Sequence, residues 1–345
     1  MRLFRWCGIL LCSAASLAVG QTAMSPIEPP EWLFPIDPDS LVPGRQPATS
    51  AKEEAPKGKE EKENEPELLS VPGSTEKFTL ARINDPFNPP DWRPASHGPM
   101  PDIVAKGRKP NAMACAFCHL PTGQGRPENS PLAGLPEAYI RQQLLDYRSG
   151  KRKAMGPVEY LPGTNMVKVA KALTDEEVDE SAKYFSQQKP RRGVFVMESL
   201  RIPRAERAAW LYYEHGGTED LEGRLIEVTQ DLTRHERRDD RLEYIAYVPP
   251  NSLNRGKKLV ITGNSLSDNA ARTVACSQCH LANLKGTDTI PPIAGRSPTY
   301  LLRQMLAFRN GMRANEASPQ MNAVVEKLTL EEMIDIVAYV ASLPP

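Results

Sequence analysis

The feature that most constrains the fold of this chain is an internal repeat. The stretch "SPLAGLPEAYIRQQLLDYRSGKR" at 130–152 aligns without a gap with "PPIAGRSPTYLLRQMLAFRNGMR" at 291–313. In both copies a C-x-x-C-H motif ends 12 residues before the second residue of this stretch. Repetition in one fixed register indicates two copies of a single domain.

Each copy reads as a small all-helical domain, and we place the two domains at 77–188 and 251–345. Gly150 and Gly311 are predicted to end the helix in the repeated stretch. A second helix then begins in each copy with a capping box. Residues at helix-face spacing form matching sets in the two copies: Tyr139, Ile140, Gln143, Leu144 and Tyr147, and Tyr300, Leu301, Gln304, Met305 and Phe308.

The segment between the copies, 189–250, has a different pattern. "RLIEVTQ" and "RLEYIAYV" are short runs rich in Val, Ile and Tyr between polar turns, and they predict a few β-strands. The charged stretch "DLTRHERRDDR" is interpreted as an exposed loop rather than a binding site. The predicted fold class is therefore mainly α, with two tandem domains joined by a small β-containing insert.

The N-terminal region indicates export. Arg2 and Arg5 precede an apolar run and a small-residue cleavage site, which is typical of a signal peptide at 1–20. The alternative is a retained anchor, but the run is shorter than the roughly 20 residues that span a bilayer. The Pro, Lys and Glu-rich segment 21–76 is predicted to be a disordered tether, although "EWLFP" at 31–35 could dock on a folded surface. No later stretch predicts a membrane span, so we expect a soluble periplasmic or secreted protein.

The C-x-x-C-H motifs account for every cysteine of the mature chain: Cys115, Cys118, Cys276 and Cys279. Two thiols one helical turn apart can add to the two vinyl groups of a porphyrin, and the following histidine, His119 or His280, then ligates the iron. The sequence thus predicts two covalently attached haem c groups. A thioredoxin-type thiol pair, a zinc site and a structural disulfide remain alternatives, but each explains less of the motif.

The repeat also selects a second axial ligand for each iron. Met166 lies seven residues before Leu173, and Met321 lies seven before Leu328, so the two methionines are equivalent. A methionine ligand raises the haem potential. Other candidates do not recur in this way: Met155, Met312, His97, His215 and His235.

Taken together, these motifs resemble class I cytochromes c, and specifically the tandem di-haem cytochromes. The resemblance rests on the "PLAG" and "PIAG" loops, the Y-x-x-x-Q helix and the late methionine, and it covers roughly 99–188 and 252–344. It implies that Pro131 and Pro292 offer their backbone carbonyls to the axial histidines. Familiar members join their halves by a short linker, so the insert and the N-terminal tether are departures.

The predicted function is electron transfer rather than catalysis. A net charge of zero argues against a nucleic-acid-binding protein. We expect redox proteins as partners, a donor and an acceptor, for example a membrane oxidase, a reductase or a dehydrogenase. The alternatives are a di-haem peroxidase-like enzyme, which needs an open iron, the cytochrome subunit of an exported dehydrogenase complex, and a haem-based sensor or scaffold.

Overall fold

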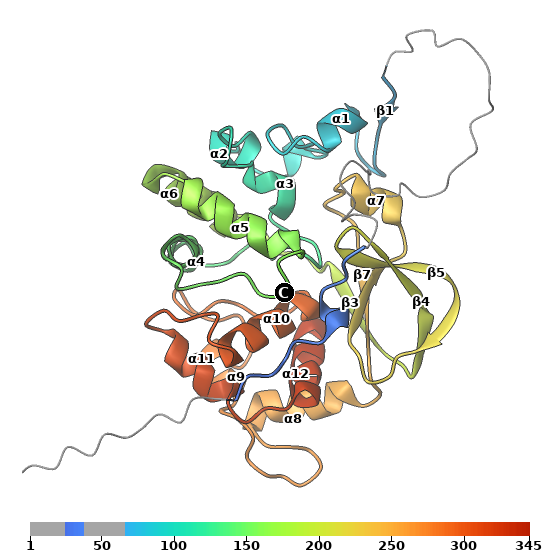
Figure 1. Ribbon diagram of the computed structural model, residues 1–345, viewed down its shortest axis with the longest axis vertical. Helices are drawn as coiled ribbons and strands as arrows, with labels where there is room; N and C mark the ends of the chain where they lie inside the picture. Colours follow the sequence, from blue (N-terminus) through green and yellow to red (C-terminus); the bar gives the residue numbers. More distant parts are fainter. Residues whose placement is uncertain (1–24, 38–65) are drawn as a thin grey trace, which may run out of the picture.

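The computed structural model describes residues 25–37 and 66–345. The predicted signal peptide at 1–20 lies outside the described residues. Two helical domains lie one above the other, and a β-sheet lies beside them (Figure 1). Within the described residues, no helix is long and apolar enough to cross a membrane.

The first helical domain holds the first C-x-x-C-H motif on a one-turn helix. Two short strands, one helical turn and a 3-10 turn precede this domain in the sequence. The elements of this preceding region are β1 (Leu68–Leu69), β2 (Phe78–Thr79), α1 (Leu80–Ile83) and η3 (Pro94–Ser96). The domain itself consists of α2 (Asp102–Ala105), α3 (Cys115–His119), α4 (Glu137–Ser149), α5 (Leu161–Ala172) and α6 (Asp175–Ser186).

The second helical domain repeats this order. Its elements are α8 (Ser252–Thr262), α9 (Cys276–His280), α10 (Pro298–Arg309), α11 (Ser318–Val325) and α12 (Leu330–Ser342). Both predicted capping boxes are present, at Thr174 with Glu177 and at Thr329 with Glu332. Gly150 ends α4 in the left-handed conformation that a side chain would disfavour. The repeated stretch therefore folds as the sequence predicts.

The two copies differ most at their N-terminal helices. In the second domain the three-turn helix α8 packs closely on α12, because a Cβ at Gly256 would lie 1.9 Å from the carbonyl oxygen of Asp335. In the first domain the corresponding helix α2 has only four residues. The first domain thus has less helix of its own to cover its core.

The insert forms a larger β-structure than the sequence suggested. A five-stranded sheet has the order β3-β7-β6-β5-β4, in which β3 runs parallel to β7 and β5 parallel to β6. Its elements are β3 (Val194–Glu198), β4 (Arg201–Ala208), β5 (Leu211–Asp220), β6 (Ile226–Thr229), α7 (Leu232–Glu236) and β7 (Tyr244–Val248). The description "mainly α" therefore holds for the two repeats and not for the insert.

The charged stretch "DLTRHERRDDR" was wrongly predicted to be an exposed loop. It forms helix α7 and the turn after it, and it buries His235, Asp239 and Asp240. Burial is possible because the charges are paired: Arg93 donates to both aspartates, and its bond to Asp239 is 2.8 Å long. Trp92 adds a bond of 2.7 Å from its indole nitrogen to the carbonyl of Arg237.

The N-terminal segment 25–37, which we call the strap, is ordered, so the prediction of a disordered tether over 21–76 was wrong there. The predicted docking of "EWLFP" is confirmed, because its first three residues form η1 (Glu31–Leu33), and Leu33 and Phe34 are buried among both domains and the insert. Residues 66–76 are also ordered, and Val71 is buried beside Phe78. In both segments a few apolar side chains are buried and so hold the backbone in place. The surrounding sequence, which is rich in Lys and Glu, has too few apolar residues to do this.

Candidate cofactor sites

The two C-x-x-C-H motifs form the same local structure. Each occupies a five-residue helix, α3 or α9, so its two cysteines lie one turn apart on one face. Each helix ends at a leucine with positive φ, 66° at Leu120 and 68° at Leu281. The chain turns away after the histidine in the same manner in both copies.

Both motif histidines are buried and held through Nδ1. His119 Nδ1 lies 2.9 Å from the carbonyl oxygen of Ser130, and His280 Nδ1 lies 2.9 Å from that of Pro291. The accepting carbonyl therefore belongs to the residue before Pro131 or Pro292, and the sequence assignment was wrong by one position. The proline carbonyls are engaged elsewhere, because Arg296 donates 2.7 Å bonds to both of them.

This arrangement leaves Nε2 of each histidine free to act as a ligand. Burial lowers the pKa of His119 to about 4, and it also lowers the pKa of His280, so both rings are neutral near pH 7. A neutral ring that donates from Nδ1 has its lone pair on Nε2. A backbone acceptor that fixes the tautomer in this way is the usual support of a metal-binding histidine.

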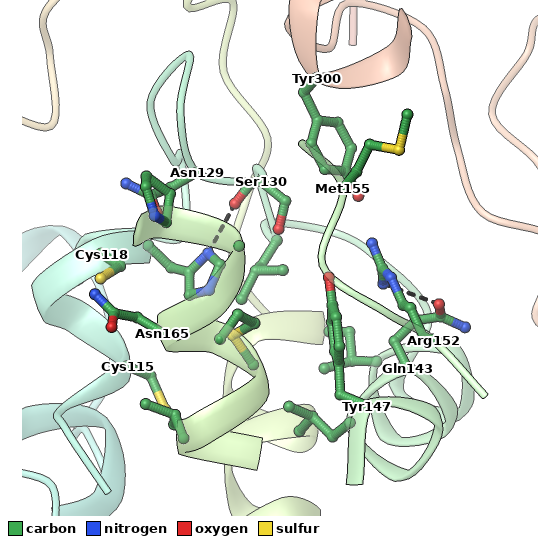
Figure 2. Close-up of a pocket in the computed structure, with 18 of the residues that line it drawn as sticks. Cys115, Cys118, Asn129, Ser130, Gln143, Tyr147, Arg152, Met155, Asn165 and Tyr300 are labelled. Carbon is green, nitrogen blue, oxygen red and sulfur yellow. Dashed lines mark hydrogen bonds between the residues drawn. The ribbon is translucent and has the colours of Figure 1, made fainter. Parts of the chain in front are cut away.

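A cavity opens beside the first motif. It holds about 1340 Å³ of space, its mouth included, and Cys115, Cys118 and His119 line it. Figure 2 shows both cysteines and Ser130 on one side of the cavity and Tyr147 with Arg152 on the other. The walls between them are largely apolar and include Leu132, Leu135, Ile140, Leu144, Val169, Leu173 and Phe185.

The two repeat-related methionines lie in equivalent places. Met166 on α5 lines this cavity, and it packs against the same apolar cluster as Cys115. Met321 on α11 packs against the same cluster as Cys276 in the second domain. Met155 also lines the first cavity, but it is packed with Phe34 and Tyr160 where the domains meet.

A hydrogen-bonded group of buried arginines joins the two domains at the far end of the cavity. Arg152 and Arg313 are equivalent in the repeat, form a short antiparallel bridge and are each 7% exposed. Arg152 donates to Gln143 at 2.9 Å and to Gln304 at 2.7 Å, whereas Arg313 donates to Gln143 at 2.8 Å. Among the described residues, none of the ion pairs involves either arginine.

The chemistry of these residues fits haem c. Two buried guanidinium groups that have no carboxylate partner among the described residues match the two propionates of a haem, since a buried charge is stable only when paired. The apolar walls match the porphyrin face, and the cysteines and the histidine lie along one wall. Arg152 and Arg313 were missed in the sequence analysis, although each is the last residue of the gapless repeat and comes two residues after Gly150 or Gly311.

The alternatives for the cysteines find less support. All four are free, so no disulfide closes either motif. Burial raises the pKa of Cys115 and of Cys276 to about 12, whereas a redox-active thiol pair needs a lowered pKa. In the described part of the chain, no three His, Cys, Asp or Glu side chains are grouped as a zinc site requires.

The three other histidines do not line the cavity. His97 lies 2.8 Å from the carbonyl of Gly98, and His235 is buried 3.0 Å from the Tyr244 hydroxyl. His215 stacks edge-on against Tyr213 at 5.8 Å. These contacts are structural, in agreement with their absence from the repeat.

Comparison with known proteins matches both repeats to one family. The sequence model of the cytochrome c family matches residues 104–189 and 254–344, together just over half of the chain. A cytochrome c-552 of Acidithiobacillus ferridurans is 26% identical over 231 residues, which is 66% of this chain and 73% of the relative. A thiosulfate dehydrogenase electron acceptor of Stutzerimonas stutzeri strain A1501 is 26% identical over 68% of this chain and 82% of its own length. A cytochrome c4 of Azotobacter vinelandii is 22% identical over 67% of this chain and 85% of its own length.

Proposed function

The chain belongs to the cytochrome c family, and from that premise we propose that it is an exported di-haem carrier that passes single electrons through two haems with histidine and methionine ligands. The observation that carries the proposal is the duplicated site. Each domain presents two cysteines, a neutral histidine with Nε2 free and a methionine against one apolar cluster.

Each residue of the site has a separate task. Cys115 and Cys118, and likewise Cys276 and Cys279, would hold a haem covalently. His119 with Met166, and His280 with Met321, would be the axial ligands. When bound, haem supplies an iron that gains or loses one electron with little change in geometry.

The surrounding chain would tune that iron. The apolar walls exclude water, and the carbonyls of Ser130 and Pro291 fix the orientation of the histidine rings. Arg152 and Arg313 would pair with propionates at the junction of the domains, where a positive charge favours the carboxylate form. These contributions set the potential and orientation of the cofactor and require no substrate.

We infer that the protein is a carrier rather than an enzyme. A peroxidase-like reaction needs one iron with an open or displaceable position, and both domains carry a methionine at the equivalent place. The name of one relative, thiosulfate dehydrogenase electron acceptor, supports a dehydrogenase as the donor class. The signal peptide, the tether over the remaining N-terminal residues and the domain limits 77–188 and 251–345 belong to the same proposal.

The test is spectroscopic. The matured protein is examined oxidised and reduced, haem is counted per chain, and carbon monoxide is added to the reduced form. We expect two low-spin haems with a methionine-to-iron band and no reaction with carbon monoxide. One high-spin haem, or one that binds carbon monoxide, would replace the carrier with the peroxidase-like or sensor function.

A further inference from the structure

We call residues 116–129 and 277–290, which begin within the two C-x-x-C-H motifs, the first and second attachment segments. They align residue by residue, yet they differ sharply in exposure to solvent. None of the 14 positions from 116 to 129 is exposed, whereas nine of the 14 equivalent positions from 277 to 290 are. Leu120 is 1% exposed and its counterpart Leu281 is 44% exposed. The repeat is therefore symmetric in sequence and asymmetric at its surface.

The insert covers the first attachment segment. The guanidinium carbon of Arg238 lies 3.6 Å from the centroid of the Phe117 ring, and Nη1 donates a 2.9 Å bond to the Phe117 carbonyl. The hydroxyl of Thr122 donates to Asp240 at 3.2 Å. Arg238 and Asp240 both follow helix α7 in the insert. The turn after α7 therefore covers the first attachment segment directly.

Helix α10 of the second domain also contacts the same segment. Arg303 is 6% exposed and donates from Nη2 to the carbonyl of Pro127. Its other terminal nitrogen reaches the carbonyl of Leu33 in the strap at 3.3 Å. The first attachment loop is thus covered by the insert and by α10, whose Arg303 is also bonded to the strap.

The second attachment segment has no such cover among the described residues. Its hydrogen bonds stay within its own domain, for example from Gly286 to the carbonyl of His280 at 2.9 Å and from Lys285 Nζ to Pro345 at 3.0 Å. Gln278, the counterpart of Phe117, is exposed, and so is Cys279. A cysteine that would carry haem therefore lies at the surface of the second domain only.

Exposed apolar side chains occur on the segments that adjoin this cysteine. The carbonyl of Gly263 accepts from the backbone nitrogens of Arg272 and Thr273 at 2.9 and 3.1 Å, so the end of α8 lies beside the start of α9. We define the α9 face by the exposed residues on these adjoining segments: Ile261, Leu266, Val274, Cys279 and Leu281. Their exposed fractions, 42% to 50% for the four apolar side chains, are high for aliphatic residues.

The α9 face carries almost no net charge. The exposed loop after Cys279 contributes one lysine, Lys285, and one aspartate, Asp288. Arg272 pairs with Asp268 at 2.7 Å and with Glu332 at 2.9 Å, so this group carries a single net negative charge. A strongly charged partner would lose solvation here without gaining an opposite charge, so the face suits an uncharged, apolar contact surface.

We propose that the α9 face is where a one-electron redox protein with an uncharged, apolar contact surface docks, and that electrons are exchanged with partners through the haem of the second domain. This inference rests on the proposed carrier function. One electron would leave the reduced centre of the partner, which would be oxidised by one unit, and it would be taken up by the haem iron for which His280 and Met321 would be the ligands. No proton or group would be transferred, and the electron would then pass within the chain to the haem that the first domain would hold.

Electron self-exchange tests the proposal, because a second copy of the chain carries the same uncharged face and serves as the probe partner. In partly reduced holoprotein, exchange broadens the NMR signals of the haem methyl groups, and each haem is monitored by its own signals. Two variants are compared: Val274→Asp alters the α9 face, and Val158→Asp alters the first domain at a residue that is 72% exposed.

We expect faster intermolecular exchange at the second haem, little change between low and high salt, a rate about tenfold lower in Val274→Asp and an unchanged rate in Val158→Asp. Equal exchange at both haems, or slowing by Val158→Asp alone, would overturn the inference while leaving the carrier function intact. The inference would also be overturned if sedimentation showed a permanent dimer that Val274→Asp dissociates. The α9 face would then be the interface of a stable dimer. Failure of both haems to be reduced reversibly would instead refute the carrier function itself.

Discussion

Replacing Phe34 by alanine tests whether the strap is an integral part of the folded protein. Phe34 is 5% exposed, and its ring meets that of Tyr160 edge-on at a centroid distance of 5.2 Å. The fit is close, since a Cβ at Gly156 would lie only 2.4 Å from the Phe34 ring. The Phe34 ring therefore lies so close to the backbone of Gly156 that there is no room for a side chain at that position.

The expected cost follows from this burial. Truncation of a buried phenylalanine to alanine lowers the free energy of unfolding by about 3–5 kcal/mol, because apolar contact is lost and a cavity remains. In a protein of this size each kcal/mol lowers Tm by about 2–4 °C, so we expect Tm to fall by about 10 °C. The edge-to-face ring pair supplies roughly 1 kcal/mol of that total.

The assay is thermal unfolding of the holoprotein followed by circular dichroism. Glu31→Ala is the matched control, because Glu31 lies in the same segment with its side chain exposed. A fall in Tm of less than about 2 °C in Phe34→Ala, equal to that of the control, would refute the reasoning. It would mean that the strap does not contribute to the stability of the fold.

Two further predictions concern ligands and pH. Met166→Ala or Met321→Ala is expected to lower the potential of the haem in its own domain by about 100 mV or more, on the order of 2 kcal/mol, and to let that haem bind carbon monoxide. Redox titration and absorption spectra measure the two effects. Unchanged spectra in both variants would contradict the ligand assignment. Burial raises the pKa of Glu227, whose side chain accepts from Thr299 at 2.6 Å, so the folded state favours its neutral form and stability is lost as pH rises through that raised pKa. Glu227→Gln should therefore remove part of the decline in Tm as the pH rises above about 4.5, and identical pH profiles of wild type and variant would show that this carboxyl does not titrate with folding.

The sequence predicted what lies within each repeat and missed what lies between them. The helices, the capping boxes and the attachment motifs depend on local pattern, and all are present. The pairing of Arg152 with Gln304 joins residues 152 positions apart, and no local pattern reveals such a contact. The repeat did hold a signal, since Arg152 and Arg313 occupy matched positions, but their burial is visible only once the domains meet.

Two errors have a common physical cause. The charged stretch after β6 and the polar segment around the strap were both interpreted as solvated because their composition is hydrophilic. Paired charges can be buried, as Arg93 shows with Asp239, and a few apolar residues can order a short segment, as Leu33 and Phe34 show. Composition averages over residues, whereas burial is decided by individual partners.

The first attachment loop is covered by other parts of the chain and, among the described residues, the second is not. We therefore predict that the two domains differ in stability when each is expressed separately. The first attachment loop depends on Arg238, Asp240 and Arg303, all of which lie outside the first domain, and its N-terminal helix α2 is a single turn. In the described part of the chain, the second loop is bonded only within its own domain, where α8 packs along α12 and Arg255 holds Asp335 through two 2.7 Å bonds.

Expressed separately, the fragment 251–345 should therefore bind haem and unfold at a higher temperature than the fragment 77–188. Extending the first fragment to 77–250, which restores the insert, should recover much of the difference, because Arg238 and Asp240 again cover the loop. Haem content and Tm of the three fragments measure this. Equal stability of 77–188 and 251–345 would mean that the insert adds surface to a first domain already complete without it.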